Sequence, residues 1–260
     1  GVPIEEDKEW DYADRFTVQA PTPATAESGY ENTIILNYKT GTVKLNLNRE
    51  HRYYASLGFD GGVWFGQGKT GTTGLYSINA RKGGNVTPIP ADHSQNLTGI
   101  WPKKMVNYKT VMSDGSSGFT SVTYPFPIIR MADLYLMYAE ALNESGESYT
   151  TVLPWIDIVR ERSGLKGVKE SWDEYVGNSK YATQTGLRQI IMQERRIELA
   201  FEGHYFWDVR RWKTATTELT QPLTGWKVKY GETDSDYYSE NLIITRDFTP
   251  KMYFWPIDIT

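Results

Sequence analysis

The sequence predicts a mainly α-helical protein with irregular, β-containing loop regions, an α+β fold with most helices in the second half of the chain. The prediction rests on a change in the pattern of apolar and turn-forming residues near residue 127. Before that point glycine and threonine alternate with short apolar runs, and no long helical period is present. After it, apolar residues recur at the spacing of helices joined by short loops. The 260 residues suffice for one compact domain with a substantial core.

The first region, residues 1–127, is predicted to consist of loops and hairpins. Residues 33–48 (TIILNYKTGTVKLNLN) have two alternating runs around a turn, which is typical of a β-hairpin. Residues 21–29 and 112–121 are rich in turn-forming residues and are expected to be loops. The glycine-rich stretch 58–74 (GFDGGVWFGQGKTGTTG) excludes a regular helix or a central strand.

The second region, residues 128–260, is predicted to hold four helices, over residues 128–146, 151–165, 187–201 and 205–212. The first is apolar nearly all round, which predicts a buried helix that ends at Gly146. Pro154 fits the first turn of the second helix, and Gly164 and Gly203 follow the ends of the second and third. Residues 252–260 are expected to form a buried terminal strand or extended segment.

Composition excludes several classes of protein. A net charge of −4, from 28 basic and 32 acidic residues, gives no electrostatic reason to expect nucleic acid as a partner. No stretch approaches the roughly 18 consecutive apolar residues of a membrane helix, and the acidic opening GVPIEEDKEW is unlike a signal peptide. The absence of cysteine excludes disulfides, thiolate metal sites and cysteine nucleophiles.

The stretch QERRIELAFEGHYFWDVRRW, residues 193–212, crowds charges among large aromatic residues. A catalytic interpretation makes Glu198 and Glu202 a pair of carboxylates, about 5–5.5 Å apart for a retaining hydrolase or roughly 6.5–9.5 Å for an inverting one. The arginines of the same stretch would hold both carboxylates ionised and leave no acid with a raised pKa. We prefer the structural interpretation, in which buried ion pairs tie two consecutive helices through Arg195, Glu198, Asp208 and Arg210.

Other patterns for chemistry are incomplete, so the sequence predicts no catalytic residue, metal site or cofactor. His204 and Asp208 have helical spacing, but a third metal ligand is not evident. Residues 234–240 (DSDYYSE) lack the glycine and spacing of a calcium loop. The tripeptide Gly-Lys-Thr at 68–70 does not complete a phosphate-binding loop, because the position of its first glycine is Val63.

Three stretches of the second region, in this order, resemble the SusD/RagB-like family: IIRMADLYLMYAEALNESG, WIDIVRERSGL and ERRIELAFEGHYFWDVRRW, followed by YFWPID near the end. The resemblance covers residues 128–260 strongly and residues 49–66 more weakly. The chain departs from the family pattern at Tyr205, where arginine is common, and at Asp258, where proline is common.

The resemblance implies a non-catalytic protein with a SusD-like scaffold that is in part tetratricopeptide-like. Such proteins are surface-exposed lipoproteins of the outer membrane in Bacteroidetes-type bacteria. They bind oligosaccharides or other nutrients and deliver them to a SusC-like TonB-dependent transporter. Their lipid anchor, attached to a cysteine, is absent from this chain. Because members usually have about twice this length, we expect the chain to be a fragment of a longer protein, with residues 1–127 nearer the ligand.

A carbohydrate site needs flat aromatic faces and polar groups on exposed loops. Of the 9 Trp, 18 Tyr and 9 Phe, most are expected in the core, including the helical residues Tyr135, Tyr138, Trp155 and Phe206. The ligand-binding candidates are the aromatic Trp64, Phe65 and Trp101 and the hydrogen-bonding Asp60, Gln67 and Lys69. The alternative is that the aromatic pair pins a glycine-rich loop to the core; we weigh both interpretations equally for Trp64 and favour the core for Phe65.

Two rival functions remain open. The first is a fragment of a glycoside hydrolase that uses paired carboxylates such as Glu198 and Glu202. The second is a helical-repeat scaffold that binds only protein. New reducing ends on a glycan substrate would favour the first, and a transporter complex without any bound glycan would favour the second.

Overall fold

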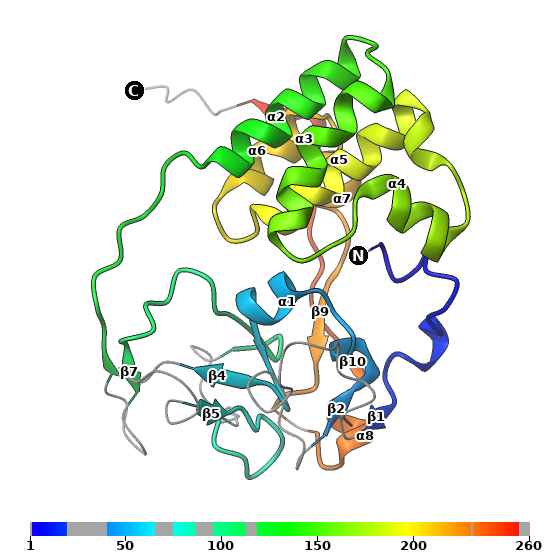
Figure 1. Ribbon diagram of the computed structural model, residues 1–260. Helices are drawn as coiled ribbons and strands as arrows, with labels where there is room; N and C mark the ends of the chain where they lie inside the picture. The colour runs from blue at the N-terminus through cyan, green and yellow to red at the C-terminus, as the bar shows by residue number, and fades with distance from the viewer. Residues whose placement is uncertain are drawn as a thin grey trace.

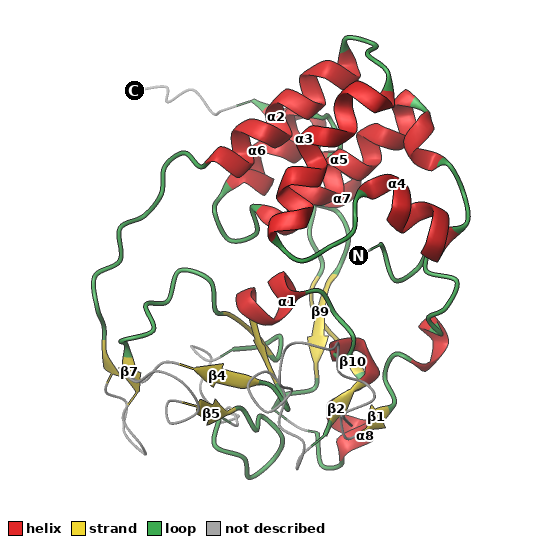
Figure 2. Cartoon of the chain, in the orientation of Figure 1, coloured by secondary structure: helices red, strands yellow, loops and turns green. Residues whose placement is uncertain are grey.

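A computed structural model describes residues 2–19, 41–65, 75–86, 96–112, 119–229 and 231–254. The longer helices gather in one half of the molecule, and the short strands lie in the other half with the small helix α1 (His51–Ser56) between them (Figure 1). Figure 2 shows how much of the strand-bearing half is loop. The mainly helical fold with irregular, β-containing regions is therefore confirmed.

The helical half contains the four predicted helical segments together with short helices that the sequence does not predict. The α-helices beyond α1 are α2 (Met131–Glu144), α3 (Tyr149–Arg162), α4 (Val168–Ser171), α5 (Gln184–Glu198), α6 (His204–Arg211), α7 (Ala215–Glu218) and α8 (Asp234–Tyr237). Helix α5 begins earlier than predicted because the Thr183 hydroxyl accepts a hydrogen bond from the Gly186 N–H (3.1 Å) and caps the helix. Helix α3 also begins earlier, so Pro154 lies beyond its first turn.

Helices α2, α3 and α5 pack around one hydrophobic cluster, and the residues that form it are spaced at helical intervals. Fully buried members are Leu136, Ala139, Val152, Ile156, Ile190 and Ile191. Burial of apolar area at roughly 25 cal/mol per Å² makes this cluster the main stabilising feature of the helical half.

The prediction that the first helix is buried all round is wrong. Along α2, Leu134 is 42% exposed and Tyr138 is 49% exposed, because α3 and α5 cover one face of the helix and leave the other open. Phe206 on α6 is also 39% exposed. Tyr135 and Trp155 are partly buried against the helical cluster, with ring centroids 6.0 Å apart.

The strand half consists of two-stranded antiparallel sheets over the described residues. The strands are β1 (Val18–Gln19), β2 (Thr42–Val43), β3 (Leu57–Phe59), β4 (Val63–Phe65), β5 (Leu75–Ser77), β6 (Ile100–Pro102), β7 (Val111–Met112), β8 (Phe119–Thr120), β9 (Leu223–Trp226) and β10 (Glu240–Ile244). They pair as β1–β2, β3–β6, β4–β5, β7–β8 and β9–β10. The glycine-rich stretch thus contributes β3 and β4, each a strand of a two-stranded sheet and neither a central strand.

The predicted hairpin at 33–48 differs from the structure in its second half. Thr42 and Val43 pair with β1, and Lys44–Asn46 form a 3₁₀ turn instead of continuing a strand. Residues 33–40 and the predicted loop at 21–29 lie outside the described residues. Short 3₁₀ or π turns also occur at Tyr12–Asp14, Trp172–Val176, Lys180–Ala182 and Pro250–Tyr253.

The division at residue 127 does not hold for the end of the chain. Trp226, Tyr237 and Tyr238 share a hydrophobic cluster with Val43 and Ile78 of the first region. Strands β9 and β10 run from the helices into the strand half (Figure 1), so residues 223–244 belong to the second region in sequence but to the strand half in space.

The predicted buried tail is also different where it is described. Pro250–Tyr253 form a 3₁₀ turn, and Phe254 is 77% exposed. Residues 255–260 lie outside the described residues. Over the parts of the chain that the structure describes, no helix is both long and apolar enough to cross a membrane.

Candidate ligand-binding site

Trp64 of β4 rests on the backbone of Gly58 in β3. A β-carbon at Gly58 would lie 2.9 Å from two atoms of the Trp64 ring. The ring therefore occupies space that is open only because residue 58 is glycine. Trp101 is the partner of Gly58 in the β3–β6 pairing. Because opposed residues of an antiparallel pair share a face, Trp101 lies on the same face of this sheet as Trp64.

Both tryptophans are half-buried against the cluster that contains Ile78 and Tyr238. Trp64 is therefore neither a fully exposed platform nor a fully buried anchor. A half-buried ring is held in place by the protein and still offers part of its surface to a ligand.

The prediction that Asp60 binds ligand is contradicted by its burial. Its carboxylate is 1% exposed and accepts hydrogen bonds from the Ala80 N–H (2.7 Å), from Arg81 Nε (2.7 Å) and from the Tyr238 hydroxyl (2.5 Å). Burial, with Asp60 beside it, raises the pKa of Tyr238 far above its usual value. Asp60 therefore holds the strand half together from inside.

The remaining predicted ligand residues cannot be placed in the site. Phe65 ends β4 opposite Leu75, but its side chain lies outside the described residues, as do Gln67 and Lys69.

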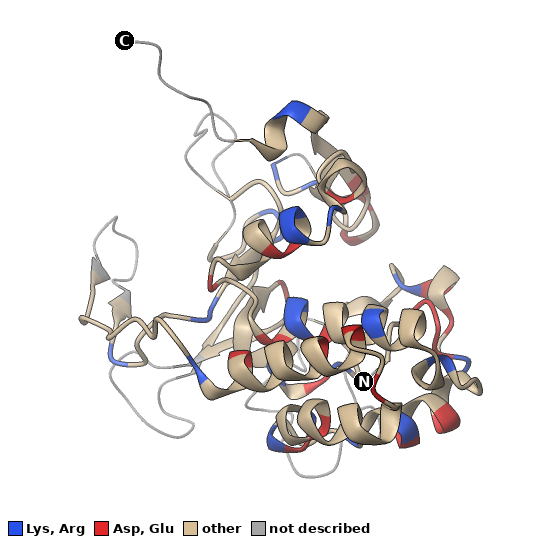
Figure 3. Ribbon diagram, turned by 90° about the horizontal axis from the view of Figure 1, so that it is seen from above, with Lys and Arg blue, Asp and Glu red and all other residues tan. Residues whose placement is uncertain are grey.

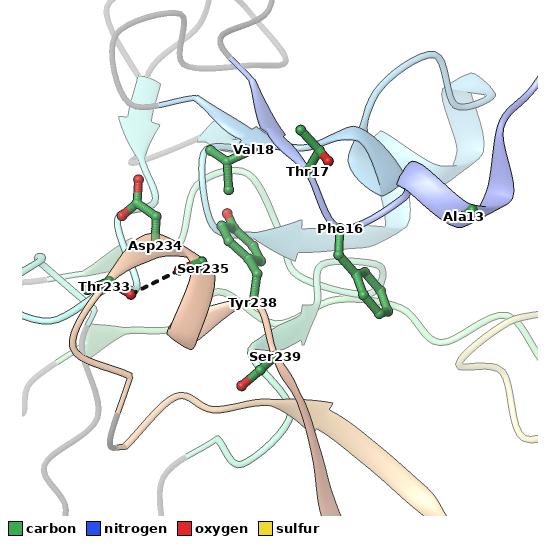
Figure 4. A pocket seen from close by; sticks show the side chains of 9 residues that line it. All are labelled: Ala13, Phe16, Thr17, Val18, Thr233, Asp234, Ser235, Tyr238 and Ser239. Atoms are coloured by element: carbon green, nitrogen blue, oxygen red, sulfur yellow. Dashed lines mark hydrogen bonds between the residues drawn. The ribbon is translucent and has the colours of Figure 1, made fainter.

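A cavity of about 720 Å³ opens beside the same hydrophobic cluster, between the N-terminal segment and α8 (Figure 4). Its lining consists of Ala13, Phe16, Thr17, Val18, Thr233, Asp234, Ser235, Tyr238 and Ser239. Phe16 and Tyr238 each pack edge-on against Trp226, with ring centroids 5.3 Å apart in both pairs. The cavity and the two tryptophans are thus supported by one core.

Sequence reasoning missed this cavity. Residues 234–240 attract attention only as an acidic loop, and Phe16 carries no motif. The available signal is the alternation of hydroxyl and acidic residues before two tyrosines in TDSDYYS, but its meaning depends on a packing partner more than 200 residues earlier in the chain.

The charged cluster of residues 193–212 lies in the helical half, away from the cavity. Arg195 is 3% exposed and bridges two buried carboxylates, Asp133 on α2 (2.9 Å) and Asp208 on α6 (3.0 Å). Asp208 also accepts from Arg211 Nε (2.8 Å). The burial and pairing expected of Arg195 and Asp208 agree with the structure, although Arg195 pairs across helices and not with Glu198.

Glu198 joins the two halves of the molecule. It is 3% exposed, and its carboxylate lies 3.1 Å from Arg52 Nη1 of α1, 3.0 Å from Arg130 Nη1 and 2.7 Å from Arg162 Nη2 of α3. Arg52 also binds Glu194 (2.5 Å). Three cations around one buried carboxylate form an ionic junction between α1 and the helices.

Arg210 differs from the expected buried ion pair. It is half-buried, its guanidinium lies 3.5 Å from the centroid of the Phe206 ring and 5.2 Å from that of Phe248, and it donates to the Phe206 carbonyl. A guanidinium over an aromatic face is stabilised without a carboxylate.

The carboxylate pair of the enzymatic interpretation is fully engaged by cations. Glu202 is bound by Arg130 Nε (2.7 Å) and by Lys104. Burial alone would raise the pKa of Glu202, but hydrogen bonds from Arg130 and Lys104 outweigh it and hold that pKa below its usual value. Glu202 is therefore a poor proton donor at neutral pH. Among the described residues no three potential ligands lie close enough to hold a metal ion.

Basic and acidic residues are interspersed along the helices that the structure describes (Figure 3).

Lys103 is the titratable group next to Trp64 whose pKa moves toward neutrality. Its ammonium donates to the carbonyls of Tyr54 (2.7 Å) and Val63 (3.1 Å), and burial lowers its pKa to about 8. The unfolded chain keeps this proton up to a pKa near 10.5, so between pH 8 and pH 10 the unfolded state binds more protons. The free energy of unfolding is therefore expected to rise by about 1–3 kcal/mol from pH 8 to pH 10.

Above pH 10 the expected trend reverses. Burial raises the pKa values of Tyr53, Tyr237 and Tyr238, so the unfolded chain loses these protons first and stability falls as pH rises further. Urea unfolding from pH 7.5 to 11 checks this maximum, and Lys103→Met should flatten the rise. A stability that falls steadily over the whole range would contradict the assignment.

The model of the SusD family matches residues 9–260. Two curated relatives from Formosa agariphila are SusD-like protein P2, 35% identical over 99 residues, and SusD-like protein P38, 34% identical over 98 residues. Each match covers 38% of this chain and 19% of the relative.

Solved structures share the fold. The structure of BT4246 superposes with a TM-score of 0.72 at 22% identity over 96% of this chain, and that of selenomethionine BT4246 with a TM-score of 0.74 at 22% identity over 97%. The chain covers 38% and 40% of those two chains, well under half of their length.

Proposed function

Since the chain belongs to the SusD family, we propose that it binds an oligosaccharide or a similar nutrient without chemical conversion and delivers it to a SusC-like TonB-dependent transporter. The family supports a nutrient-binding role in Bacteroidetes-type bacteria. The ligand, the transporter and the position on the outer membrane as a lipid-anchored, surface-exposed protein are parts of the proposal.

The observation that carries the proposal is the pairing of a hydroxyl-lined cavity with two half-buried tryptophans on one hydrophobic cluster. Sugars are bound by aromatic surfaces together with a few polar groups that fix orientation. The strand half of this chain supplies both, Trp64 and Trp101 on one sheet face and the cavity beside α8.

The chemistry of the carboxylates supports binding over hydrolysis. Hydrolysis of a glycosidic bond needs a carboxylic acid that keeps its proton near neutral pH. Glu198 and Glu202 lie among arginine and lysine side chains at the ionic junction, and the hydrogen bonds from Arg130 and Lys104 hold the pKa of Glu202 below its usual value. They connect helices and line no part of the cavity.

We also propose that these residues are part of a longer protein. The solved relatives extend far beyond the part that this chain matches. The test is the mass of the protein isolated from its source, which should be well above that of 260 residues; a mass equal to it would contradict the proposal.

Trp64→Ala tests whether the Trp64 ring contacts the glycan. We expect at least about tenfold weaker binding to the glycan that the chain selects from an array, because an aromatic contact of roughly 1.5 kcal/mol is lost. The unfolding free energy should fall by less than the roughly 3–5 kcal/mol of a fully buried tryptophan. Titration calorimetry and a melting curve on the same variant measure the two effects.

Trp207→Ala is the matched control, since Trp207 is 59% exposed on α6 in the helical half. It should leave glycan affinity unchanged. Unchanged affinity in Trp64→Ala, or an equal loss in both variants, would remove Trp64 from the site.

A further inference from the structure

We propose that the cavity beside α8 binds an uncharged sugar residue whose hydroxyl groups donate hydrogen bonds to the lining. It excludes acidic sugars such as uronates and sulfated residues. The inference rests on the proposed function and adds the chemical class of the ligand. It is carried by the direction in which the lining groups already donate their protons and by the pairing of the cations nearby.

Three of the five hydroxyl groups of the lining donate to protein acceptors, while Thr233 and Ser235 share one hydrogen bond (3.1 Å). Thr17 donates to the Asp14 carboxylate, Ser239 to the Asp236 carbonyl (2.6 Å), and Tyr238 to the Asp60 carboxylate (2.5 Å). A hydroxyl has one proton and two lone pairs, so these groups have only acceptor capacity left for a ligand.

Asp234 adds a further acceptor and the only formal charge of the lining. Its side chain is 56% exposed, and one of its oxygens accepts from Arg81 Nη1 (2.6 Å). A carboxylate offers about four lone-pair sites, so Asp234 can still accept from a ligand. Its position at the start of α8 and its side chain at the cavity are seen in Figure 4.

The cation paired with Asp234 is committed to the protein. Arg81 is 15% exposed; its Nε donates to Asp60, its Nη1 to Asp234 and its Nη2 to the Gly41 carbonyl (2.7 Å). It therefore has no bidentate face to offer to a carboxylate or sulfate, which is how arginine usually binds such groups.

Among the described residues, other charged groups near the cavity are also engaged, and the Arg15 guanidinium lies 4.2 Å from the Phe16 ring centroid and donates to the Tyr12 carbonyl (2.9 Å). Asp14 pairs with Lys44, Asp236 with Lys227 (2.6 Å), and Glu232 with Lys82 (2.6 Å). Most of the unshared hydrogen-bonding capacity at the cavity surface is therefore that of acceptors, although the pair of Thr233 and Ser235 keeps one hydroxyl proton. A sugar hydroxyl donates to such a surface, whereas the carboxylate of a uronate or a sulfate group only accepts hydrogen bonds and meets Asp234 as a like charge.

The test compares methyl glycosides of glucose, galactose and mannose with their C6-oxidised uronates, each at millimolar concentration, by saturation-transfer NMR on the whole chain. We expect at least one neutral glycoside to bind at least about tenfold more tightly than its uronate, the size of a like-charge penalty above roughly 1.4 kcal/mol. Equal or tighter binding of the uronates overturns the proposal, and so does the absence of saturation transfer to every neutral glycoside.

Two variants place the binding in this cavity. Ser235→Trp fills the mouth from an exposed position on α8 and should abolish saturation transfer, while Thr217→Trp, at an exposed position on α7, should not. Asp234→Asn removes the like charge and releases an Arg81 donor, so the preference for the neutral sugar should narrow by about fivefold or more. Equal signals in the wild type and in Ser235→Trp would overturn the proposal.

These experiments separate failure of the cavity inference from failure of the proposed glycan-binding function. Oligosaccharide binding that depends on Trp64 but survives Ser235→Trp leaves the function in place and overturns only the cavity's role. A chain that binds no glycan on an array, wild type and variants alike, overturns both.

Discussion

Arg195→Ala is expected to lower the unfolding free energy by about 3–5 kcal/mol, because removal of one partner from a buried ion pair leaves the other charge uncompensated. The guanidinium makes three hydrogen bonds, two to Asp208 (3.0 and 3.2 Å) and one to Asp133 (2.9 Å). Asp133 is 6% exposed and Asp208 is 4% exposed. Asp208 retains Arg211, so most of the loss should arise at Asp133. Denaturant unfolding followed by circular dichroism measures it.

Arg196→Ala is the control one position along the same helix. Its guanidinium is 44% exposed and pairs with Glu218 at 2.8 Å, and such surface pairs contribute about 0–1 kcal/mol. An Arg195→Ala variant as stable as Arg196→Ala would show that Arg195 does not hold α2, α5 and α6 together.

Glu198→Gln is expected to lower the unfolding free energy by about 3 kcal/mol. The substitution keeps the shape but removes the negative charge that faces Arg52, Arg130 and Arg162. Arg52 and Arg130 retain Glu194 and Glu202 as partners, which places the effect at the lower end of the range for a buried pair.

Glu170→Gln is the matched control, since Glu170 is 62% exposed and pairs with Lys166 at 3.2 Å. It should cost less than about 1 kcal/mol. If Glu198→Gln unfolds at the same urea concentration as the control, the junction between α1 and the helices is not a stabilising feature.

The helices could be predicted because their information is local. The spacing of Leu187, Ile190 and Ile191 defines the buried face of α5. Gly146 and Gly164 follow the ends of α2 and α3 as predicted. Gly203 instead is the N-cap of α6, because α5 ends at Glu198 and not at residue 201. The exposed face of α2 could not be predicted, because periodicity shows that Leu134 is apolar and not which neighbour covers it.

The strand half depends on contacts distant in sequence, and here prediction was partial. Trp226 and Tyr238 complete a cluster with Val43 and Ile78, which no local pattern indicates. Asp60 looked like a loop residue available to ligand, but Arg81 and Tyr238 enclose it.

The same limit applies to the candidate site. Trp64 could be singled out from its glycine-rich surroundings, but its seat on Gly58 follows from the pairing of β3 with β6 and β4 with β5. The cavity beside α8 combines residues 13–18 with residues 233–239, so only the folded chain shows it.

The central claim, binding without conversion, is tested most directly by recovering a bound glycan. The chain is incubated with the oligosaccharide that it selects from an array, the complex is isolated, and the released sugar is analysed by mass spectrometry together with a reducing-end assay. The account predicts a glycan of unchanged mass, bound by the wild type and lost in Trp64→Ala. New reducing ends that disappear in Glu198→Gln or Glu202→Gln, both checked for folding, would contradict it.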